Sequence, residues 1–373
     1  MGLKISKKIL SGGLLYLILF KITPLKAQQA SIPGAEVTPL QTEIILENIS
    51  SFPQKTELSI AILKGDTVNF VGLKLENDSL IFCQNQDFLF EIGAITKVFT
   101  SSLFASLVIG GVVKLEDPMV KFLDFTPKQS KKGRKEITLL SLANHTSGLP
   151  NHPNFLVKLS HYKIEDPYAV FGKPQMEQYL KKRMKLKSPP GEKYEYSNLG
   201  VGILGYLLEN KTGKSYQQMI EDEVFSTYNM PNSELGEKYY SGKLVKGRDK
   251  KGVIVPPANF NAMLSSGGIL STTQDLSNFI LANFSNDYVM DFQRTKTFSI
   301  SQNMDMALGW HIMKTEGEQK WFWHNGATAG YKAAMVMDVK NQKSIIVLSN
   351  ISGFNPIMEN IDLLTLELMD TLY

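Results

Sequence analysis

The chain has 373 residues, of which 43% are hydrophobic and 20% charged, and this ordinary globular composition excludes a largely disordered protein. Its formal net charge is +4, but residues 1–27 hold five lysines and no acid, so the rest of the chain is not basic and nucleic acid is not an expected partner. The single cysteine, Cys83, excludes an internal disulfide and a multi-cysteine metal site.

Residues 1–27 are typical of an export signal. A basic stretch over 1–8 precedes an apolar run over 9–20, and Leu25-Lys26-Ala27 offers a cleavage site that ends in a small residue. The apolar run is too short for a comfortable membrane span. We therefore expect a secreted or periplasmic protein with no stable membrane span after leader removal. A leader retained as an anchor is the alternative.

Strand patterns lie near both ends of the chain. Residues 40–52 have the spacing of a helix, and the next strand-like runs are 58–63, 68–75 and 80–83. In the last third, the pattern predicts strands over 307–313, 320–323, 333–338 and 344–350, and a closing helix over 355–372. The two ends are therefore expected to share one sheet.

The middle of the chain has a helical pattern. A helix that contains Lys97 is apolar over more than one face, which is typical of a buried helix. Further helices are expected over 177–187, from 201 to Gly213, and after a cap at Ser271 or Thr272, while 131–135 is a basic surface loop. We predict an α+β fold in which 28–96 and 260–373 form an antiparallel sheet flanked by helices. Residues 97–259 form a mainly helical domain, with the active site at the junction.

Lys97 is the first candidate functional residue. A lysine one turn into a buried helix is costly unless it has partners or a task, because desolvating an ammonium lowers its pKa. Position 94 lies three residues earlier, on the same helical face. In one group of enzymes this spacing holds a serine hydroxyl against a lysine amine and so activates a nucleophile. Here position 94 is alanine, and the attacking hydroxyl is absent.

Three separated motifs resemble those of a known enzyme family. They are Ala94-Ile95-Thr96-Lys97, Tyr196-Ser197-Asn198 and His324-Asn325-Gly326. In this order and at these distances they resemble the motifs of the penicillin-recognising serine hydrolases. The second and third are most similar to the branch of class C β-lactamases, DD-carboxypeptidases and β-lactamase-fold esterases. A class C β-lactamase usually has lysine where His324 stands.

The resemblance implies a role for each catalytic position. A serine at position 94 would attack a carbonyl and form an acyl-enzyme, while Lys97 and Tyr196 would move its proton. Lys97 would lower the pKa of the Tyr196 phenol by placing a positive charge nearby. No cofactor or metal is implied. The expected substrates are D-alanyl peptides, β-lactams or small esters.

The resemblance also implies a substrate-binding set. Asn198 would hold Lys97 and bind a substrate amide, and His324 would face the substrate and sense its charge near neutral pH. Gly326 leads to Ala327, whose backbone N–H would form an oxyanion hole together with that of residue 94. Structural alternatives are a core role for Tyr196 and for His324. His145, in a loop bounded by Gly and Pro, is expected to fix that loop.

Ala94 leaves two interpretations open. It is either a deliberate replacement that traps a bound substrate or the natural residue of a non-catalytic relative. In both cases the chain as written is not expected to acylate, because losing such a nucleophile typically reduces turnover by about 10⁶. The first hypothesis is thus an exported hydrolase scaffold, active once serine occupies position 94. The second is a pseudoenzyme that binds cell-wall peptide. A plain structural export protein would instead leave Lys97, Tyr196 and His324 apart. The sequence leaves the oligomeric state open.

Overall fold

The computed structural model describes residues 32–77, 79–235, 243–317 and 319–373. The predicted leader, 1–27, lies outside the described residues. Within these ranges, no helix combines the length and the apolar character needed to cross a bilayer.

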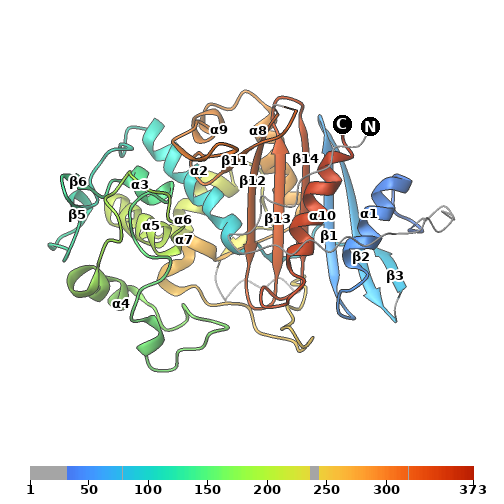
Figure 1. Cartoon of the computed structure of the whole chain (residues 1–373), viewed down its shortest axis with the longest axis horizontal. Helices are drawn as coiled ribbons and strands as arrows, with labels where there is room; N and C mark the ends of the chain where they lie inside the picture. Colours follow the sequence, from blue (N-terminus) through green and yellow to red (C-terminus); the bar gives the residue numbers. More distant parts are fainter. Residues whose placement is uncertain (1–31, 78, 236–242, 318) are drawn as a thin grey trace.

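Both ends of the chain build one nine-stranded antiparallel sheet in the order β3-β2-β1-β14-β13-β12-β11-β10-β9 (Figure 1). Its strands are β1 (Glu57–Lys64), β2 (Thr67–Glu76), β3 (Ser79–Cys83), β9 (Phe298–Ser301), β10 (Met304–Met306), β11 (His311–Lys314), β12 (Lys320–Ala327), β13 (Lys332–Asp338) and β14 (Lys343–Ser349). Adjacent β1 and β14 join the first and last thirds of the chain, with Ile60 opposite Val347. The expected sharing of one sheet by both ends is confirmed.

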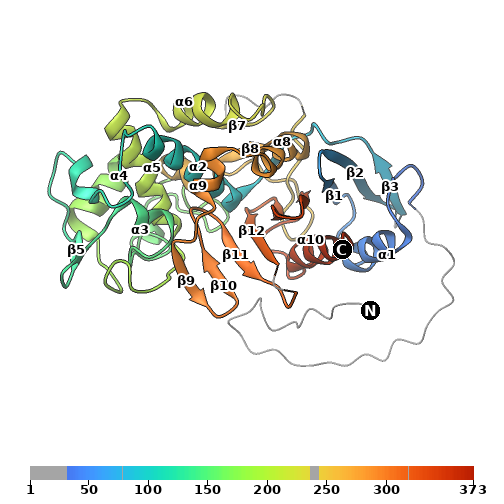
Figure 2. The same cartoon turned by 90° about the horizontal axis from the view of Figure 1, so that it is seen from above.

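Helices cover both faces of this sheet. On one face, α1 (Pro39–Ile49) packs beside α10 (Glu359–Asp370), which contacts β13 and β14. On the other, α8 (Thr273–Phe284) contacts β1 and β14 (Figure 2). All residues of β13 are buried, which agrees with a central strand covered on both sides.

The helical part lies beside the β9–β12 half of the sheet (Figure 1). Its elements are α2 (Thr96–Ile109), α3 (Leu139–Ala143), α4 (Lys173–Gln178), α5 (Asn198–Thr212), α6 (Tyr216–Ile220), α7 (Leu264–Gly267) and α9 (Tyr288–Gln293). A small three-stranded sheet is formed by β4 (Phe90–Glu91), β8 (Ile269–Ser271) and β7 (Glu234–Leu235), and the chain runs from β4 toward α2. A second small sheet pairs β5 (Lys131–Lys132) with β6 (Lys135–Glu136). The predicted α+β class is confirmed. The domain boundaries stay a prediction, and α2 contacts α9 across one of them.

Some predicted elements differ from those observed. Of the strand expected over 307–313, only residues 311–313 lie in a strand, β11, because a turn at Gly309 with φ +73° separates β11 from β10. A Cβ at Gly309 would lie 2.7 Å from the Lys97 carbonyl oxygen, so this turn packs directly on α2. The basic loop expected at 131–135 is a hairpin, and β9 and β10 form where no strand is expected. The expected helix over 177–187 starts earlier, at Lys173, and its last helical turn ends at Arg183.

Candidate active site

Ala94 and Lys97 lie at the start of α2. Ala94 belongs to a short 3₁₀ turn, Gly93–Ile95, that leads into the helix. Lys97 is one turn further and only 1% exposed. Its Nζ donates a hydrogen bond to the Ser266 carbonyl oxygen at 2.6 Å and lies 5.2 Å from the centroid of the Tyr196 ring. Two of the three predicted motifs therefore meet.

Two glycines let the end of β12 lie against this turn. Gly93 has φ +50°, and a Cβ there would be 2.8 Å from the Ala327 nitrogen. A Cβ at Gly326 would be 2.0 Å from the Ile92 carbonyl oxygen and 2.6 Å from the Ala94 nitrogen. Real side chains essentially never come so close, so the approach requires glycine at both positions. It brings the backbone of Ala94 and that of Ala327 together, as a shared oxyanion hole would need.

The second motif is held at the N-terminus of α5. Ser197 caps the helix, accepting from the Gly200 N–H at 2.8 Å and donating to the Pro150 carbonyl at 2.7 Å. The Ser197 N–H donates to His145 Nδ1 at 3.2 Å, and the His145 ring lies 4.5 Å from that of Tyr196. His145 thus connects its own loop to the tyrosine loop, in agreement with the expected loop-fixing role.

His324, in the third motif, is buried beside His311. It is 2% exposed, and its Nδ1 is 2.7 Å from the Asn325 carbonyl oxygen, so Nδ1 carries the hydrogen. Its ring packs 5.5 Å from that of His311, whose Nε2 is hydrogen-bonded to the Tyr194 hydroxyl at 2.7 Å. His324 does not line the cavity described next. Its ring packs on His311 of the adjacent strand, and its role in binding a substrate stays a prediction.

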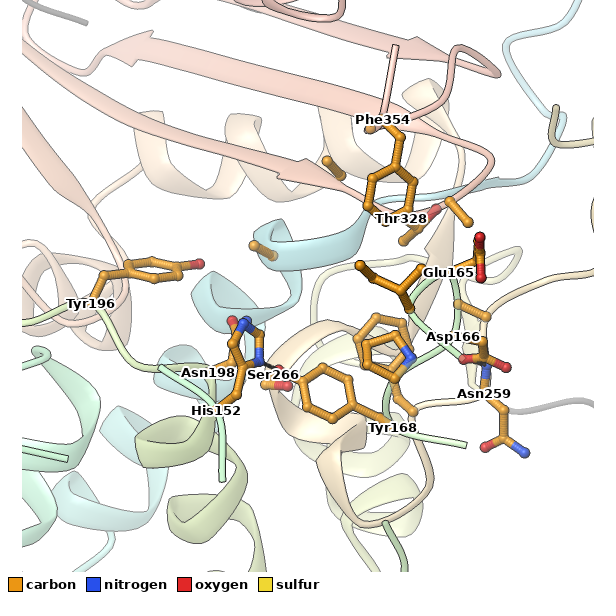
Figure 3. A pocket seen from close by; sticks show the side chains of 18 residues that line it. His152, Glu165, Asp166, Tyr168, Tyr196, Asn198, Asn259, Ser266, Thr328 and Phe354 are labelled. Atoms are coloured by element: carbon orange, nitrogen blue, oxygen red, sulfur yellow. Dashed lines mark hydrogen bonds between the residues drawn. The ribbon is translucent and has the colours of Figure 1, made fainter. Parts of the chain in front are cut away.

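A cavity of about 320 Å³ is lined by residues of the first two motifs and by Ala327, which follows the third (Figure 3). Four predicted site residues line it: Ala94, Tyr196, Asn198 and Ala327. Lys97 and Gly326 are not among the lining residues, and both are buried. Loops without a recognisable motif supply other lining side chains, which the sequence did not reveal: His152, Glu165, Asp166, Tyr168, Phe260 and Phe354.

Comparison with known proteins decides the family. The family model described as Beta-lactamase matches residues 84–369, which is most of the chain. The chain belongs to the beta-lactamase family. The catalytic roles of individual residues stay predictions.

This beta-lactamase family member is similar to proteins from several bacteria. It is 27% identical to the D-alanyl-D-alanine-carboxypeptidase/endopeptidase AmpH of Escherichia coli strain K12 over 310 residues, which cover 76% of this chain and 77% of AmpH. It is 24% identical to penicillin-binding protein 4* of Bacillus subtilis over 284 residues, covering 70% of this chain but only 60% of that protein. The solved β-lactamase/D-alanine carboxypeptidase of Yersinia pestis, complexed with citrate, has a TM-score of 0.72 at 22% identity, and the alignment covers 89% of this chain and 96% of that one. The predicted β-lactamase/transpeptidase-like fold is confirmed.

Burial sets the proton affinities of the two central groups in this family member. It lowers the pKa of Lys97 from 10.5 to about 7, so the amine is partly neutral at physiological pH and able to accept a proton. Burial also raises the pKa of the Tyr196 phenol, with smaller contributions from Tyr194 and Tyr168. Lys97 is not among the groups that set this pKa, so the expected lowering by Lys97 is not seen, and desolvation of the phenolate by burial is the largest cause.

The imidazoles around the site are neutral. Burial, followed by the charge of Lys97, holds the pKa of His145 well below its usual range. Burial, then His311 and then Lys97, does the same for His324. The pKa of His311 falls to about 4, again mainly through burial. The expectation that His324 senses charge near neutral pH is therefore wrong, because a buried imidazole beside other potential cations stays uncharged.

Asn198 contacts the cavity wall and not the lysine. Its side chain is hydrogen-bonded to the Tyr168 hydroxyl, which also lies 2.5 Å from His152 Nδ1. The Lys97 amine donates to the Ser266 carbonyl oxygen, and among the described residues no hydrogen bond joins it to Asn198, so the expected hold of Asn198 on Lys97 stays a prediction. A role for Asn198 in binding a substrate amide stays a prediction. Among the described residues, no group of histidine, cysteine and acidic side chains is arranged to hold a metal ion.

Proposed function

We propose that this protein is an exported acyl-transfer scaffold of the beta-lactamase family that binds D-alanyl peptides, β-lactams or small esters and, with alanine at position 94, does not cleave them. One observation carries the proposal: a buried lysine amine with a pKa of about 7 lies one helical turn from Ala94 and against Tyr196, beside a cavity of about 320 Å³. The basic and apolar pattern of residues 1–27 supports export.

A serine at position 94 would complete the machinery for an acyl-transfer reaction. The Lys97 amine would accept the hydroxyl proton as the oxygen attacks the substrate carbonyl, and the acyl-enzyme would form as the C–N or C–O bond breaks. Tyr196, whose phenol is neutral, would donate a proton to the leaving group and regain it from the protonated amine. Backbone N–H groups of residue 94 and Ala327 would bind the oxyanion, each typically worth about 3 kcal/mol. Water would then release the acyl group.

Without the hydroxyl, the first of these steps has no nucleophile. The Ala94 methyl group has no lone pair with which to attack a carbonyl. The neighbouring Thr96 hydroxyl is engaged elsewhere, because it accepts a hydrogen bond from the Ile269 N–H at 3.1 Å. The close approach of the Ala94 and Ala327 backbones, which supports the proposed oxyanion hole, does not depend on the hydroxyl. The chain as written is then a binding protein for the same ligands, which is the second candidate function, a pseudoenzyme for cell-wall peptide.

The Ala94→Ser variant separates the two candidates. If the machinery is intact, this variant hydrolyses a chromogenic ester or cephalosporin, and the added substitution Lys97→Met abolishes that activity. If the folded variant turns over neither substrate, yet the unaltered chain binds a D-alanyl-D-alanine peptide in calorimetry, the pseudoenzyme is supported. If neither turnover nor binding is observed, the proposed function is wrong.

A further inference from the structure

The strand that carries the third motif loses one neighbour just before it reaches the candidate site. β11 pairs with β12 only as far as His311 opposite Trp323. Beyond this pair, the turn that holds Ala94 lies beside β12, and a Cβ at Gly326 would be 2.6 Å from the Ala94 nitrogen. The last residues of β12 are therefore held by a strand on one side only, and that strand is β13.

Strand pairing turns the Ala327 N–H away from β13. The Thr328 N–H donates to the Tyr331 carbonyl oxygen at 2.9 Å, which makes these two residues a hydrogen-bonded pair. Bonded and non-bonded pairs alternate along antiparallel strands. The next pair, Ala327 opposite Lys332, is therefore non-bonded, and the Ala327 N–H points toward the side where Ala94 lies. The direction of this N–H thus depends on how β12 is held from behind.

A buried ion pair holds both strands at this point. Asp362, on α10, accepts hydrogen bonds through its Oδ2 from the Asn325 amide at 2.9 Å and from the Lys332 amine at 2.8 Å. Asp362 is 5% exposed and Lys332 is 3% exposed, and α10 lies beside β13 (Figure 1). Asn325 shares a face of β12 with Ala327, two residues later, and Lys332 is directly opposite Ala327. One carboxylate therefore joins β12 to β13 around Ala327.

This ion pair is a poor source of stability. Burial is the largest influence on the pKa of Asp362 and raises it, although the charge of Lys332 and hydrogen bonds from Lys332 and Asn325 act in the opposite direction. Desolvation offsets much of the attraction in a buried pair, and apolar residues of similar volume often stabilise a fold equally well. Apolar residues lack directional hydrogen bonds, however. The pair is therefore better explained by the position it gives to the two strands than by stability.

We propose that Asp362 is a positioning residue: through Asn325 and Lys332 it holds the end of β12 so that the Ala327 N–H points at the carbonyl oxygen of a bound ligand. The inference rests on the proposed function, because it assumes that Ala327 and residue 94 form the oxyanion hole. It gives a role in the reaction to α10, none of whose residues is among those that line the cavity.

The test is made in the Ala94→Ser background, where the proposed reaction supplies a rate. Asp362→Asn removes the charge that binds Lys332, and the double substitution Asp362→Leu with Lys332→Met replaces the ion pair by apolar side chains. We expect each to lower kcat for a chromogenic ester about 10- to 100-fold, because a misplaced oxyanion donor stabilises the transition state poorly. KM should change by less than about three-fold, because the cavity walls that bind the ester are unaltered.

Stability measurements separate positioning from a general loss of structure. Denaturant unfolding of the apolar double variant should give a midpoint close to that of Ala94→Ser alone, although its kcat is lower. Asp305→Asn is the matched control, because Asp305 is also a buried acid of the sheet region, 4% exposed and paired with Lys296 and Lys314. This control should keep the kcat of Ala94→Ser.

Failure of the inference differs from failure of the proposed function. If Asp362→Asn and the double variant keep the kcat of Ala94→Ser, or if kcat falls equally in Asp305→Asn, Asp362 is not a positioning residue, while the proposed function stands. Because Asp362→Asn keeps the shape of the side chain, it tests the inference even if the double variant does not fold. If Ala94→Ser itself neither turns over the ester nor becomes acylated, the proposed function is wrong, and the inference falls with it.

Discussion

The Lys97 amine lies 5.2 Å from the centroid of the Tyr196 ring, although the two residues come from different helix starts far apart in the chain. Both groups are desolvated by the same packing, which makes the lysine a weaker base and the tyrosine a weaker acid than in water. The pair is therefore arranged so that the amine, and not a phenolate, accepts protons at neutral pH.

The buried lysine is expected to destabilise the fold, as functional groups often do. Its folded-state pKa of about 7 is below the ordinary 10.5, so the folded state disfavours the proton that the unfolded state holds. This cost is complete below about pH 7 and disappears as the pH rises toward about 10.5. Lys97→Met should thus raise the free energy of unfolding at about pH 6 by on the order of 1 kcal/mol or more.

Chemical denaturation at several pH values measures this difference. The gain in Lys97→Met should shrink at alkaline pH, whereas Lys211→Met, at an exposed position on α5, should show no such trend. A Lys97→Met variant that is less stable than the original chain at every pH would show that the amine is a net stabilising group.

Glu91 predicts the opposite pH dependence. Its pKa is raised from 4.5 to about 7, so the folded state favours the protonated carboxyl, and stability is lost as the pH rises through this range. Glu91→Gln keeps the shape and removes the charge. We expect it to be more stable than the original chain at about pH 8, with a difference of about 1 kcal/mol or more that vanishes near pH 4.

Thermal unfolding of Glu91→Gln across this pH range checks the prediction. Equal melting temperatures for both proteins at pH 8 would mean that the buried carboxylate is fully compensated by its hydrogen bonds to the wall of the cavity.

The close approach at Gly326 predicts a large effect from one methyl group. A Cβ there would lie 2.0 Å from the Ile92 carbonyl oxygen and 2.6 Å from the Ala94 nitrogen, and because both of these are backbone atoms, neither can move aside as the end of a flexible side chain could. Gly326→Ala should cost about 1–3 kcal/mol of stability and should separate the Ala94 and Ala327 backbones. Gly110→Ala is the matched control, because the nearest atom to its Cβ is at 3.3 Å. Denaturant titration should show a clearly smaller loss for the control.

Nitrogen NMR of the imidazoles tests the neutral site. His145, His311 and His324 should keep the signals of neutral rings from about pH 8 to about pH 5.5, because burial lowers the pKa of each one. The Nδ1 of His324 should carry its hydrogen. A His324 resonance that titrates between pH 6 and pH 7 would restore the charge-sensing role that the sequence suggested.

Sequence reasoning located the fold and the motifs because their signals are local. The apolar spacing around Lys97, the glycine after His324-Asn325 and the strand runs at both ends each reflect a short stretch of chain. The orientation of His324 was not predictable, since it depends on its contact with His311 from the adjacent strand. The place of Glu165 and Asp166 in the cavity wall was not predictable either, because they lie in a loop whose sequence has no periodic pattern and no motif.

Intact-protein mass spectrometry of Ala94→Ser after mixing with a penicillin tests the central claim most directly. The account predicts a covalent adduct with the mass of the opened penicillin, located on the peptide that contains residue 94. The adduct should be absent from the unaltered chain and from Ala94→Ser combined with Lys97→Met. A folded Ala94→Ser protein that acquires no adduct from a penicillin or a reactive ester, or an equal adduct on the unaltered chain, would contradict the account.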